Sequence, residues 1–247
     1  MSGYRFDWSA VLGGQPLSWL MHGVGVTVVL TALAAMLASA LAVLLLSLRL
    51  APFRPAGWLA GSWVQVFRNT PLAVQMLFWY FGGVPLLPES WRDTLSGSHA
   101  LLGLPLPGTE LLVAAWSLGL FGSAFLAEDL RAGLRAVPFG QWEAARSQGF
   151  ATIGALRRVI LPQALAHAWP PLVNQYLNLL KNSPLAMSIA VAELMYQTNQ
   201  IESFNFHAIE AYAVASAIYL LLGLVLSLLL GRLGPTPLHE RKGRHGG

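Results

Sequence analysis

Two short stretches of the chain place a basic residue directly before polar residues and a proline. The first reads Arg68-Asn69-Thr70-Pro71, and the second reads Lys181-Asn182-Ser183-Pro184. Both stretches lie inside runs that are otherwise apolar. Proline removes a backbone hydrogen bond and loosens the preceding turn of a helix. Charges and loosened backbone are tolerated at membrane depth only where protein or water covers them.

The two stretches predict a pair of interrupted helices, which is the usual sequence sign of a transport pathway. The residues predicted to line that pathway are Arg68, Asn69, Thr70, Gln75, Lys181, Asn182 and Ser183. Asn178 and Ser188 are further hydrogen-bonding candidates nearby. A second interpretation stays open, in which Arg68 and Lys181 only cap loosened carbonyls and hold helices together.

The composition indicates a membrane protein. Of the 247 residues, 55% are hydrophobic and only 11% are charged, and the mean hydropathy is +0.56. These values lie outside the usage of soluble domains. There is no cysteine, so disulfides and thiolate sites are excluded, and the six histidines lack ligand spacing. We therefore expect no metal or cofactor. The sequence also contains no basic helix with interleaved aromatic residues, so nucleic-acid binding is not expected.

Five apolar runs reach the length of roughly twenty residues that a bilayer-spanning helix needs. These runs are Leu20–Leu48, Trp58–Phe81, Leu111–Ala127, Pro171–Met195 and Ala208–Gly231. The predicted fold is an all-α, polytopic helical bundle, forming one transmembrane domain over residues 1–247. In the first run, Ala34, Ala38 and Ala42 recur one turn apart, a spacing that permits close packing of helices.

Basic residues beside these runs predict the orientation of the chain. Eleven of the 15 Lys and Arg residues fall on one side: Arg49, Arg54, Arg131, Arg135, Arg146, Arg157, Arg158, Arg232, Arg241, Lys242 and Arg244. That side is expected to be cytoplasmic, with the N-terminus outside and the C-terminus inside. The outer loop, residues 82–110, reads as a short lid with Trp91 as an interfacial anchor. The polar, glycine-rich tail from residue 234 to 247 is expected to be disordered.

The longest cytoplasmic stretch, about residues 136–168, predicts two short helices joined at Gly149. Pro138 is expected to stop the preceding helix, Glu143 to begin a new one, and Pro162 to end the second. The apolar residues of the second helix recur at helical spacing: Phe150, Ile153, Leu156 and Ile160. This apolar face either packs on the ends of the chain's own helices or needs a protein partner.

The segment "EAARSQGFATIGALRRVILP" resembles the EAA loop of ABC-importer permeases. The matching positions are Glu143, Ala144, Ala145, Gly149, Leu161 and Pro162, while Val159 stands where that family has isoleucine. The similarity extends over roughly residues 18–232 and is to the polar amino acid branch, which carries histidine, glutamate, glutamine, arginine and opines. Within that branch the sequence is similar to glutamate/aspartate permease subunits. Asp129 departs from the family, which usually has an apolar residue there.

The resemblance implies a type I ABC-importer permease in the bacterial inner membrane. Such a permease pairs with a second permease subunit, binds two ATPase subunits and receives an amino acid from an extracytoplasmic binding protein. The residues expected to couple to the ATPase are Glu143, Ala144, Ala145, Gly149, Phe150, Ile153, Leu156, Leu161 and Pro162. The chain is not expected to be an enzyme, because it contains no phosphate-binding G-x-x-x-x-G-K-[ST] loop.

The alternative from another class is a stand-alone secondary carrier or channel. Five spans and an apolar cytoplasmic loop count against it. So does the lack of an acidic residue deep in the first, second or fifth apolar run.

Overall fold

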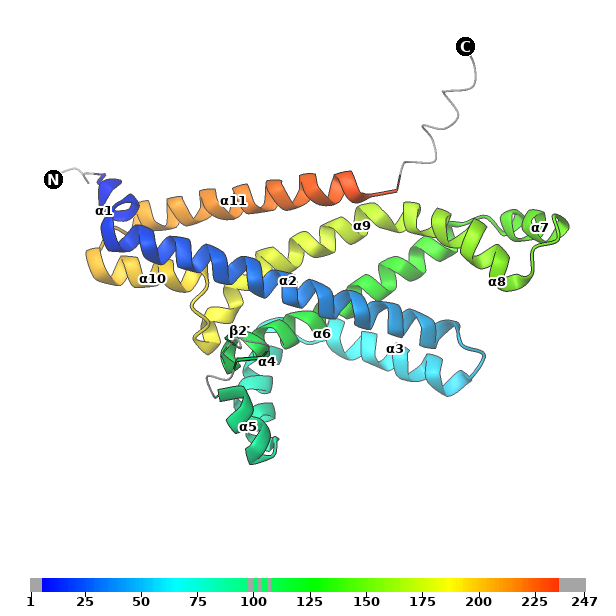
Figure 1. Ribbon diagram of the computed structural model, residues 1–247, viewed down its shortest axis with the longest axis horizontal. Helices are drawn as coiled ribbons and strands as arrows, with labels where there is room; N and C mark the ends of the chain where they lie inside the picture. Colours follow the sequence, from blue (N-terminus) through cyan, green and yellow to red (C-terminus); the bar gives the residue numbers. More distant parts are fainter. Residues whose placement is uncertain (1–5, 97–99, 102–103, 106–107, 236–247) are drawn as a thin grey trace, which may run out of the picture.

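A computed structural model describes residues 6–96, 100–101, 104–105 and 108–235. These residues form an elongated helical bundle, with α1 and α10 gathered at one end and α7 and α8 at the other (Figure 1). The described strands are the short antiparallel pair β1 (Ala100–Leu101) and β2 (Leu104–Pro105). Most of the predicted tail, from residue 236 on, lies outside the described residues.

Three described helices are long and apolar enough to cross a membrane by themselves: α2 (Gly14–Leu50), α6 (Thr109–Ala136) and α11 (Ala208–Leu233). The other described α-helices are α1 (Ser9–Leu12), α3 (Arg54–Asn69), α4 (Leu72–Leu77), α5 (Glu89–Ser96), α7 (Phe139–Ser147), α8 (Thr152–Ala155), α9 (Leu161–Asn182) and α10 (Leu194–Asn205). Short π- or 3₁₀-helical segments are η1 (Phe78–Gly83), η2 (Val84–Leu86), η3 (Leu156–Ile160) and η4 (Ser183–Ile189). The all-α prediction is confirmed.

The core forms where α2 packs on α6, because both helices present small residues to each other. Ala34, Ala38 and Ala42 are fully buried, which confirms the predicted close-packing face of the first run. Opposite them, Gly119 lies against the side chain of Leu37, and Gly122 lies near Ala38. Small residues let two helix backbones approach, and this approach is what stabilises helix pairs inside a membrane.

The second predicted span is not one continuous helix. The run Trp58–Phe81 is divided into α3 and α4 by extended backbone at Thr70 and Pro71, and α4 continues into the π-helical η1. Proline disfavours helical backbone in the residue before it, so the break falls at the proline. The predicted interruption of the helix at this proline is confirmed.

The fourth predicted span begins earlier than expected and also ends earlier. Instead of Pro171–Met195, α9 runs from Leu161 through Pro170 and Pro171 to Asn182. The chain then forms the 3₁₀ segment η4, reverses at Ala190 with φ +62°, and begins α10. The sequence analysis did not predict α10.

The loop between α6 and α9, predicted to be cytoplasmic, differs from its prediction at two boundaries. Pro138 does stop α6, but α7 already begins at Phe139 rather than at Glu143. Gly149 adopts φ +83°, a left-handed conformation that suits glycine, and so makes the predicted turn. Pro162 does not end the second helix: it lies at the start of α9, directly after the π-helical η3. Residues 152–182 are therefore helical throughout, with the π-helical η3 in the middle.

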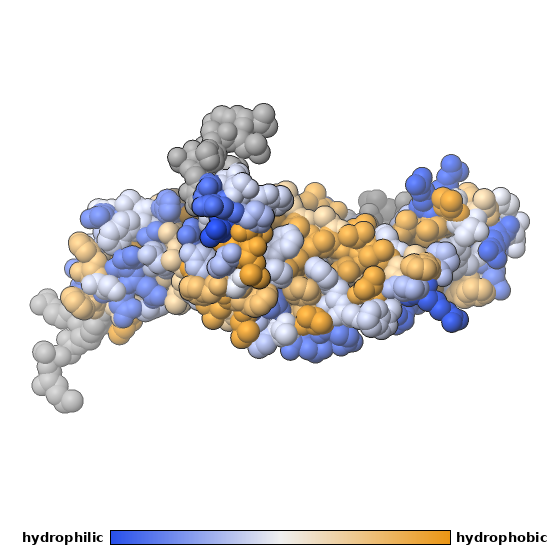
Figure 2. All heavy atoms as spheres, turned by 90° about the horizontal axis from the view of Figure 1, so that it is seen from below, coloured by the Kyte–Doolittle hydropathy of each residue, from blue (hydrophilic) through white to orange (hydrophobic). Residues whose placement is uncertain are grey.

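The surface matches a protein that crosses a membrane. On the face seen in Figure 2, hydrophobic side chains cover much of the middle of the molecule, and hydrophilic ones gather toward both ends. The exposed large apolar residues of α11 include Leu220, Leu224 and Leu228. An exposed apolar surface of this extent is expected where lipid, rather than water, is the solvent.

Candidate functional site: a polar face and a coupling loop

The break between α3 and α4 is held by side chains that satisfy its free carbonyls. Asn69 donates to the carbonyl of Gln65 at 2.8 Å, and Thr70 donates to the carbonyl of Val66 at 2.8 Å. Gln75 donates to the carbonyl oxygens of Phe67 and Thr70, at 3.1 and 3.0 Å. These three predicted pathway residues therefore cap the backbone that Pro71 leaves unpaired, although Asn69 and Thr70 are also exposed.

The second break, after α9, is built in a similar way but with fewer bonds. Ser183 is fully buried and donates to the carbonyl of Leu180 at 2.9 Å. Asn182 is half-buried and Lys181 is exposed, and none of the ion pairs among the described residues involves Lys181. Because α4 packs directly on η4, the two proline-marked breaks lie next to each other in the molecule.

Arg68 reaches across to α6 rather than to the loosened carbonyls. Its guanidinium lies 5.1 Å from the centre of the Phe125 ring, a cation–π contact. Arg68 also interacts electrostatically with Asp129, whose carboxylate accepts a hydrogen bond from Gln175 of α9. The other oxygen of Asp129, Oδ2, is buried with no hydrogen-bond partner in the described part of the chain. The groups that act on Asp129 from other helices are thus Arg68 of α3 and Gln175 of α9.

A polar stripe runs along α9. Its residues are all exposed and recur every three, four or seven residues: His167, Asn174, Asn178 and Lys181. This spacing places all four side chains on one face of the helix. Asn178 and Lys181 are among the candidates predicted from the sequence, whereas His167 and Asn174 are not. The same periodicity in the sequence would have revealed His167 and Asn174.

Glu128 holds α2 and α6 together close to this region. It forms a hydrogen-bonded ion pair with Arg49, the basic residue in the last turn of α2. Arg131, one turn further along α6, lies 3.6 Å from the same carboxylate oxygen. Glu128 therefore pairs both with Arg131 of its own helix and with Arg49 of α2, and it acts as a structural tie rather than a ligand group.

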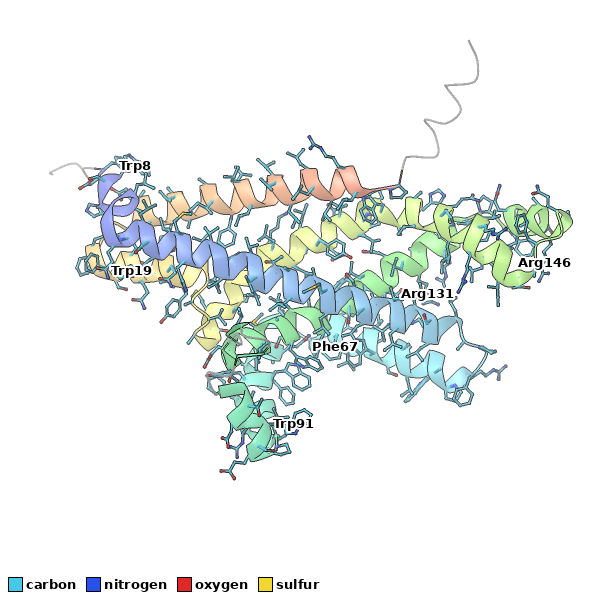
Figure 3. All side chains as sticks on the ribbon, viewed as in Figure 1. Trp8, Trp19, Phe67, Trp91, Arg131 and Arg146 are labelled. Atoms are coloured by element: carbon cyan, nitrogen blue, oxygen red, sulfur yellow. The ribbon has the colours of Figure 1, made fainter. Side chains whose placement is uncertain are left out.

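The EAA segment forms a projecting unit at the far end of the bundle from α1. Figure 3 shows Arg146 at this end, and Trp8 and Trp19 at the opposite one. Glu143 and Ala144 are exposed on α7, whereas Ala145 is buried against the bundle. Phe139, Trp142, Glu143 and Arg146 surround a surface hollow of about 220 Å³.

The sequence left two interpretations of the apolar face of the second short helix: packing on the chain's own helices, or binding of a protein partner. The structure has residues of both kinds. Ile160 is fully buried, and Leu156 packs with it in a cluster with Val137 and Ala164. Ile153, by contrast, is 68% exposed. Phe150 is half-buried, with the guanidinium of Arg158 6.0 Å from its ring centre. Leu161 and Pro162 are exposed at the start of α9.

No group of three or more potential metal-ligating side chains occurs in the described residues. The described residues combine long apolar helices, a stripe of polar side chains on α9 and a projecting unit of two short helices. This is the arrangement of a membrane-embedded transport subunit.

The comparison with protein families agrees with this class. Residues 43–237 match the family described as "Binding-protein-dependent transport system inner membrane component", and the chain belongs to this family. It is therefore a permease subunit of an ABC importer, and ATP hydrolysis is carried out by a separate ATPase subunit. This membership excludes the stand-alone carrier.

Several curated relatives are amino acid permeases. The chain is 38% identical over 181 residues to the probable glutamine ABC transporter permease protein GlnM of Bacillus subtilis, covering 73% of this chain and 76% of the relative. It is 32% identical over 221 residues to the arginine ABC transporter permease protein ArtQ of Escherichia coli K12, covering 87% and 92%. It is 31% identical over 232 residues to the glutamate/aspartate import permease protein GltJ of the same strain, covering 91% and 92%.

Solved structures share the fold. The crystal structure of an amino acid ABC transporter with histidines matches with a TM-score of 0.77 and 30% identity, covering 93% of this chain and 98% of that chain. An inward-facing structure of the MetNI methionine ABC transporter matches with a TM-score of 0.64 and 18% identity, which supports the fold alone. The predicted type I ABC-importer permease fold is confirmed.

Proposed function

We propose that this permease carries polar amino acids along a pathway lined by the exposed polar face of α9 and the α3–α4 break. The observation that carries the proposal is the stripe of His167, Asn174, Asn178 and Lys181, beside the exposed Arg68. In hydrocarbon such groups would cost several kcal/mol each. They therefore need to face a water-filled path or a second protein.

The partner on this face is proposed to be a second permease subunit, either another copy of this chain or a relative. Two ATPase subunits would then dock on the cytoplasmic side, one on each α7–α8 unit, through Glu143, Ala144 and the exposed Ile153. A binding protein would deliver substrate at the α1 and α10 end. This arrangement requires the predicted orientation, with the N-terminus outside and the C-terminus in the cytoplasm.

The substrate class is proposed from the relatives and from Lys181. Relatives are named for glutamine, arginine and glutamate/aspartate, whose side chains are neutral, cationic and anionic. The α-carboxylate is common to all of them, and the exposed ammonium group of Lys181 is suited to receive it. Glutamate or aspartate is one member of this class. Competition of labelled uptake by unlabelled amino acids identifies the preferred member.

Replacement of Lys181 by methionine tests the pathway. Methionine keeps the length and packing of the side chain and removes its charge. Uptake should fall at least several-fold, while complex yield, melting temperature and basal ATP hydrolysis stay unchanged. Lys181→Arg is the matched control and should retain most uptake. Normal transport by Lys181→Met, or a complex that falls apart, would reject a pathway role for this residue.

A reporter experiment tests the orientation separately. A reporter active only in the cytoplasm should work when fused after Arg244 or between Ser147 and Ala155, and should be silent within residues 96–103. The reverse pattern would overturn the orientation.

A further inference from the structure

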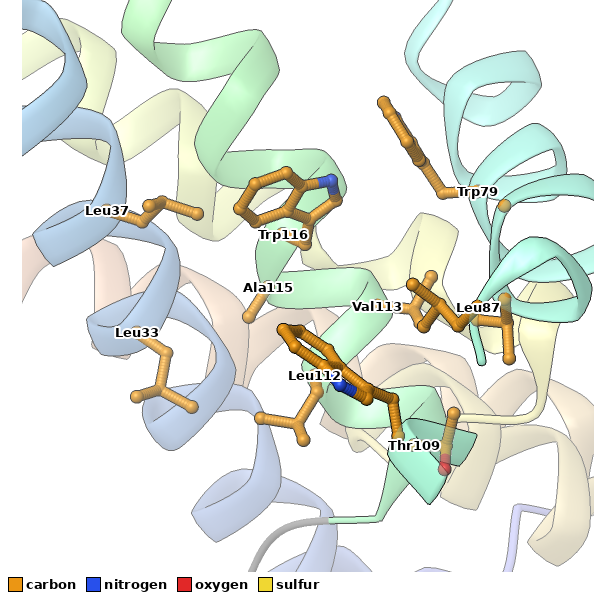
Figure 4. A pocket seen from close by; sticks show the side chains of 12 residues that line it. Leu33, Leu37, Trp79, Leu87, Thr109, Leu112, Val113, Ala115 and Trp116 are labelled. Carbon is orange, nitrogen blue, oxygen red and sulfur yellow. The ribbon is translucent and has the colours of Figure 1, made fainter. Parts of the chain in front are cut away.

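A cavity of about 540 Å³ lies between the α2–α6 pair and the segment that follows α4. Figure 4 shows Leu33 and Leu37 of α2 on one side, Trp79 and Leu87 on the other, and Trp116 of α6 between them. The remaining lining comes from Gly83, Val84, Trp91, Thr109, Leu112, Val113 and Ala115. Apart from the hydroxyl of Thr109 and the indole N–H groups, the lining side chains carry no polar atoms.

The cavity is separated from the polar face proposed as the pathway. Trp116 and Phe125 are nine residues apart on α6, which at about 3.6 residues per turn places them on opposite sides of the helix. Phe125 contacts Arg68, and Asp129 contacts Gln175 of α9. No residue of α3, α9, α10 or α11 is among those lining the cavity. A partner subunit on the polar face therefore leaves the cavity open to the bilayer.

The cavity also has an amphipathic entrance. The residues of α6 that line it, from Thr109 to Trp116, form the first turns of that helix. With the orientation proposed above, these turns lie in the outer leaflet. The short helix α5 adds Trp91, and its exposed residues Glu89 and Asp93 are charged. Tryptophan and charged residues at an entrance to an apolar space match the boundary between lipid headgroups and acyl chains.

We propose that this cavity is a binding site for an acyl chain of a phospholipid from the outer leaflet. The chain lies between α2, α6 and η1, and the headgroup lies beside α5. A cavity with apolar walls at this depth excludes water, so hydrocarbon from the bilayer fills it with contacts that an empty space would forfeit. The bound chain adds contacts to the segment from η1 to α5, which packs on α6 through Trp79 and Tyr80. This proposal rests on the orientation given under the proposed function, but it concerns a different face of the protein from the transport pathway. Its test measures lipid binding and not transport.

A photoreactive benzoylphenylalanine at Leu112 tests the site in the full-length chain. The variant is purified from membranes, washed extensively in detergent and irradiated, and its mass is then measured by mass spectrometry. We expect about one phospholipid to be cross-linked to each protein chain. The matched control carries the same probe at Leu44 of α2, which is 52% exposed and does not line the cavity. Its lipid should be lost in the wash, so it should give no adduct.

Filling the cavity supplies the second arm. Ala115→Phe in the Leu112-probe background should abolish the adduct, whereas Ala40→Phe, at an exposed alanine of α2 outside the cavity, should leave it unchanged. An adduct between two copies of the chain at Leu112 would assign the cavity to the permease interface and overturn the proposal. Equal labelling from Leu112 and Leu44 would also overturn it. That comparison remains decisive if Ala115→Phe does not fold.

Discussion

The hydroxyl of Tyr219 on α11 donates a hydrogen bond of 2.6 Å to the carboxylate of Glu193. Glu193 is fully buried, and its other carboxylate oxygen caps α10 by accepting from the N–H of Tyr196 at 2.8 Å. The adjacent N–H of Leu194 donates to the hydroxyl of Thr27 on α2 at 3.1 Å. Three helices thus meet at one buried carboxylate, and the return of the chain after η4 depends on it.

Tyr219→Phe should destabilise this junction, because a buried acceptor would lose its partner at a cost of about 1–3 kcal/mol. The measurement is the melting temperature of the purified chain in detergent. Tyr212→Phe is the control, since its hydroxyl donates to the half-exposed Glu202 at 2.7 Å, where water can substitute. Equal losses from the two substitutions would contradict a special role for the junction at Glu193.

Gly133 marks a close approach of α6 and α9. A Cβ atom at this position would lie 2.4 Å from the carbonyl oxygen of Ala164 and 2.7 Å from the Cβ of Ala168. Gly133→Ala should therefore force the two helices apart and lower both the melting temperature and the yield of folded protein, at a cost on the order of 1–3 kcal/mol. Gly140→Ala on α7 meets nothing within 4 Å and should be neutral or slightly stabilising. A Gly133→Ala chain as stable as the Gly140→Ala chain would show that the crossing can relax.

The sequence predicted the features that depend on local signals. The prolines at 71, 138 and 184 and the glycine at 149 act on their own turns, and the structure has a break or turn at each. The small residues Ala34, Ala38 and Ala42 likewise predicted a buried face from their spacing. Proline alone was misleading at 162, where a helix was predicted to end, and at 171, where a span was predicted to begin, because the helix continues through both positions.

The features that the sequence did not predict depend on distant contacts. The helix α10 follows a reversal at Ala190, where no glycine marks the left-handed backbone. Its cap is Glu193 rather than one of the usual short polar residues, and the cap is stabilised by Tyr219 from another helix. The electrostatic interaction of Arg68 with Asp129 and the apolar cavity also depend on how helices far apart in the sequence pack together.

The turn at Gly149 offers a test of coupling that leaves the membrane helices intact. Valine does not adopt φ +83° without strain, so Gly149→Val should distort the link between α7 and α8. We expect normal insertion and melting temperature, but uptake and ATPase stimulation by the binding protein should fall at least tenfold. Gly154→Val is the matched control, because Gly154 lacks a positive φ and a Cβ there would meet Phe150 at an ordinary 3.5 Å. Normal uptake by Gly149→Val would remove the turn from the coupling mechanism.

Arg68 and Asp129 allow the structural and transport roles of a charge to be separated. Arg68→Met should leave the Asp129 carboxylate without its nearby cation, while Oδ2 already lacks a hydrogen-bond partner in the described residues. Because Arg68 itself is exposed, the expected loss of stability is modest, on the order of 1 kcal/mol. Adding Asp129→Asn removes the orphaned charge, and the Arg68→Met/Asp129→Asn chain should recover the melting temperature of the wild type.

Uptake by this doubly substituted chain then decides what Arg68 does. If Arg68 lines the pathway, the doubly substituted chain is stable but transports at least several-fold more slowly, because Asp129→Asn does not restore the positive charge of Arg68. If Arg68 only neutralises Asp129, uptake recovers together with stability. Asp129→Asn alone is the control, since it keeps Arg68 on Phe125 and should preserve the fold. Failure of the second substitution to restore stability would show that the cation–π contact, rather than the pairing with Asp129, is the structural role of Arg68.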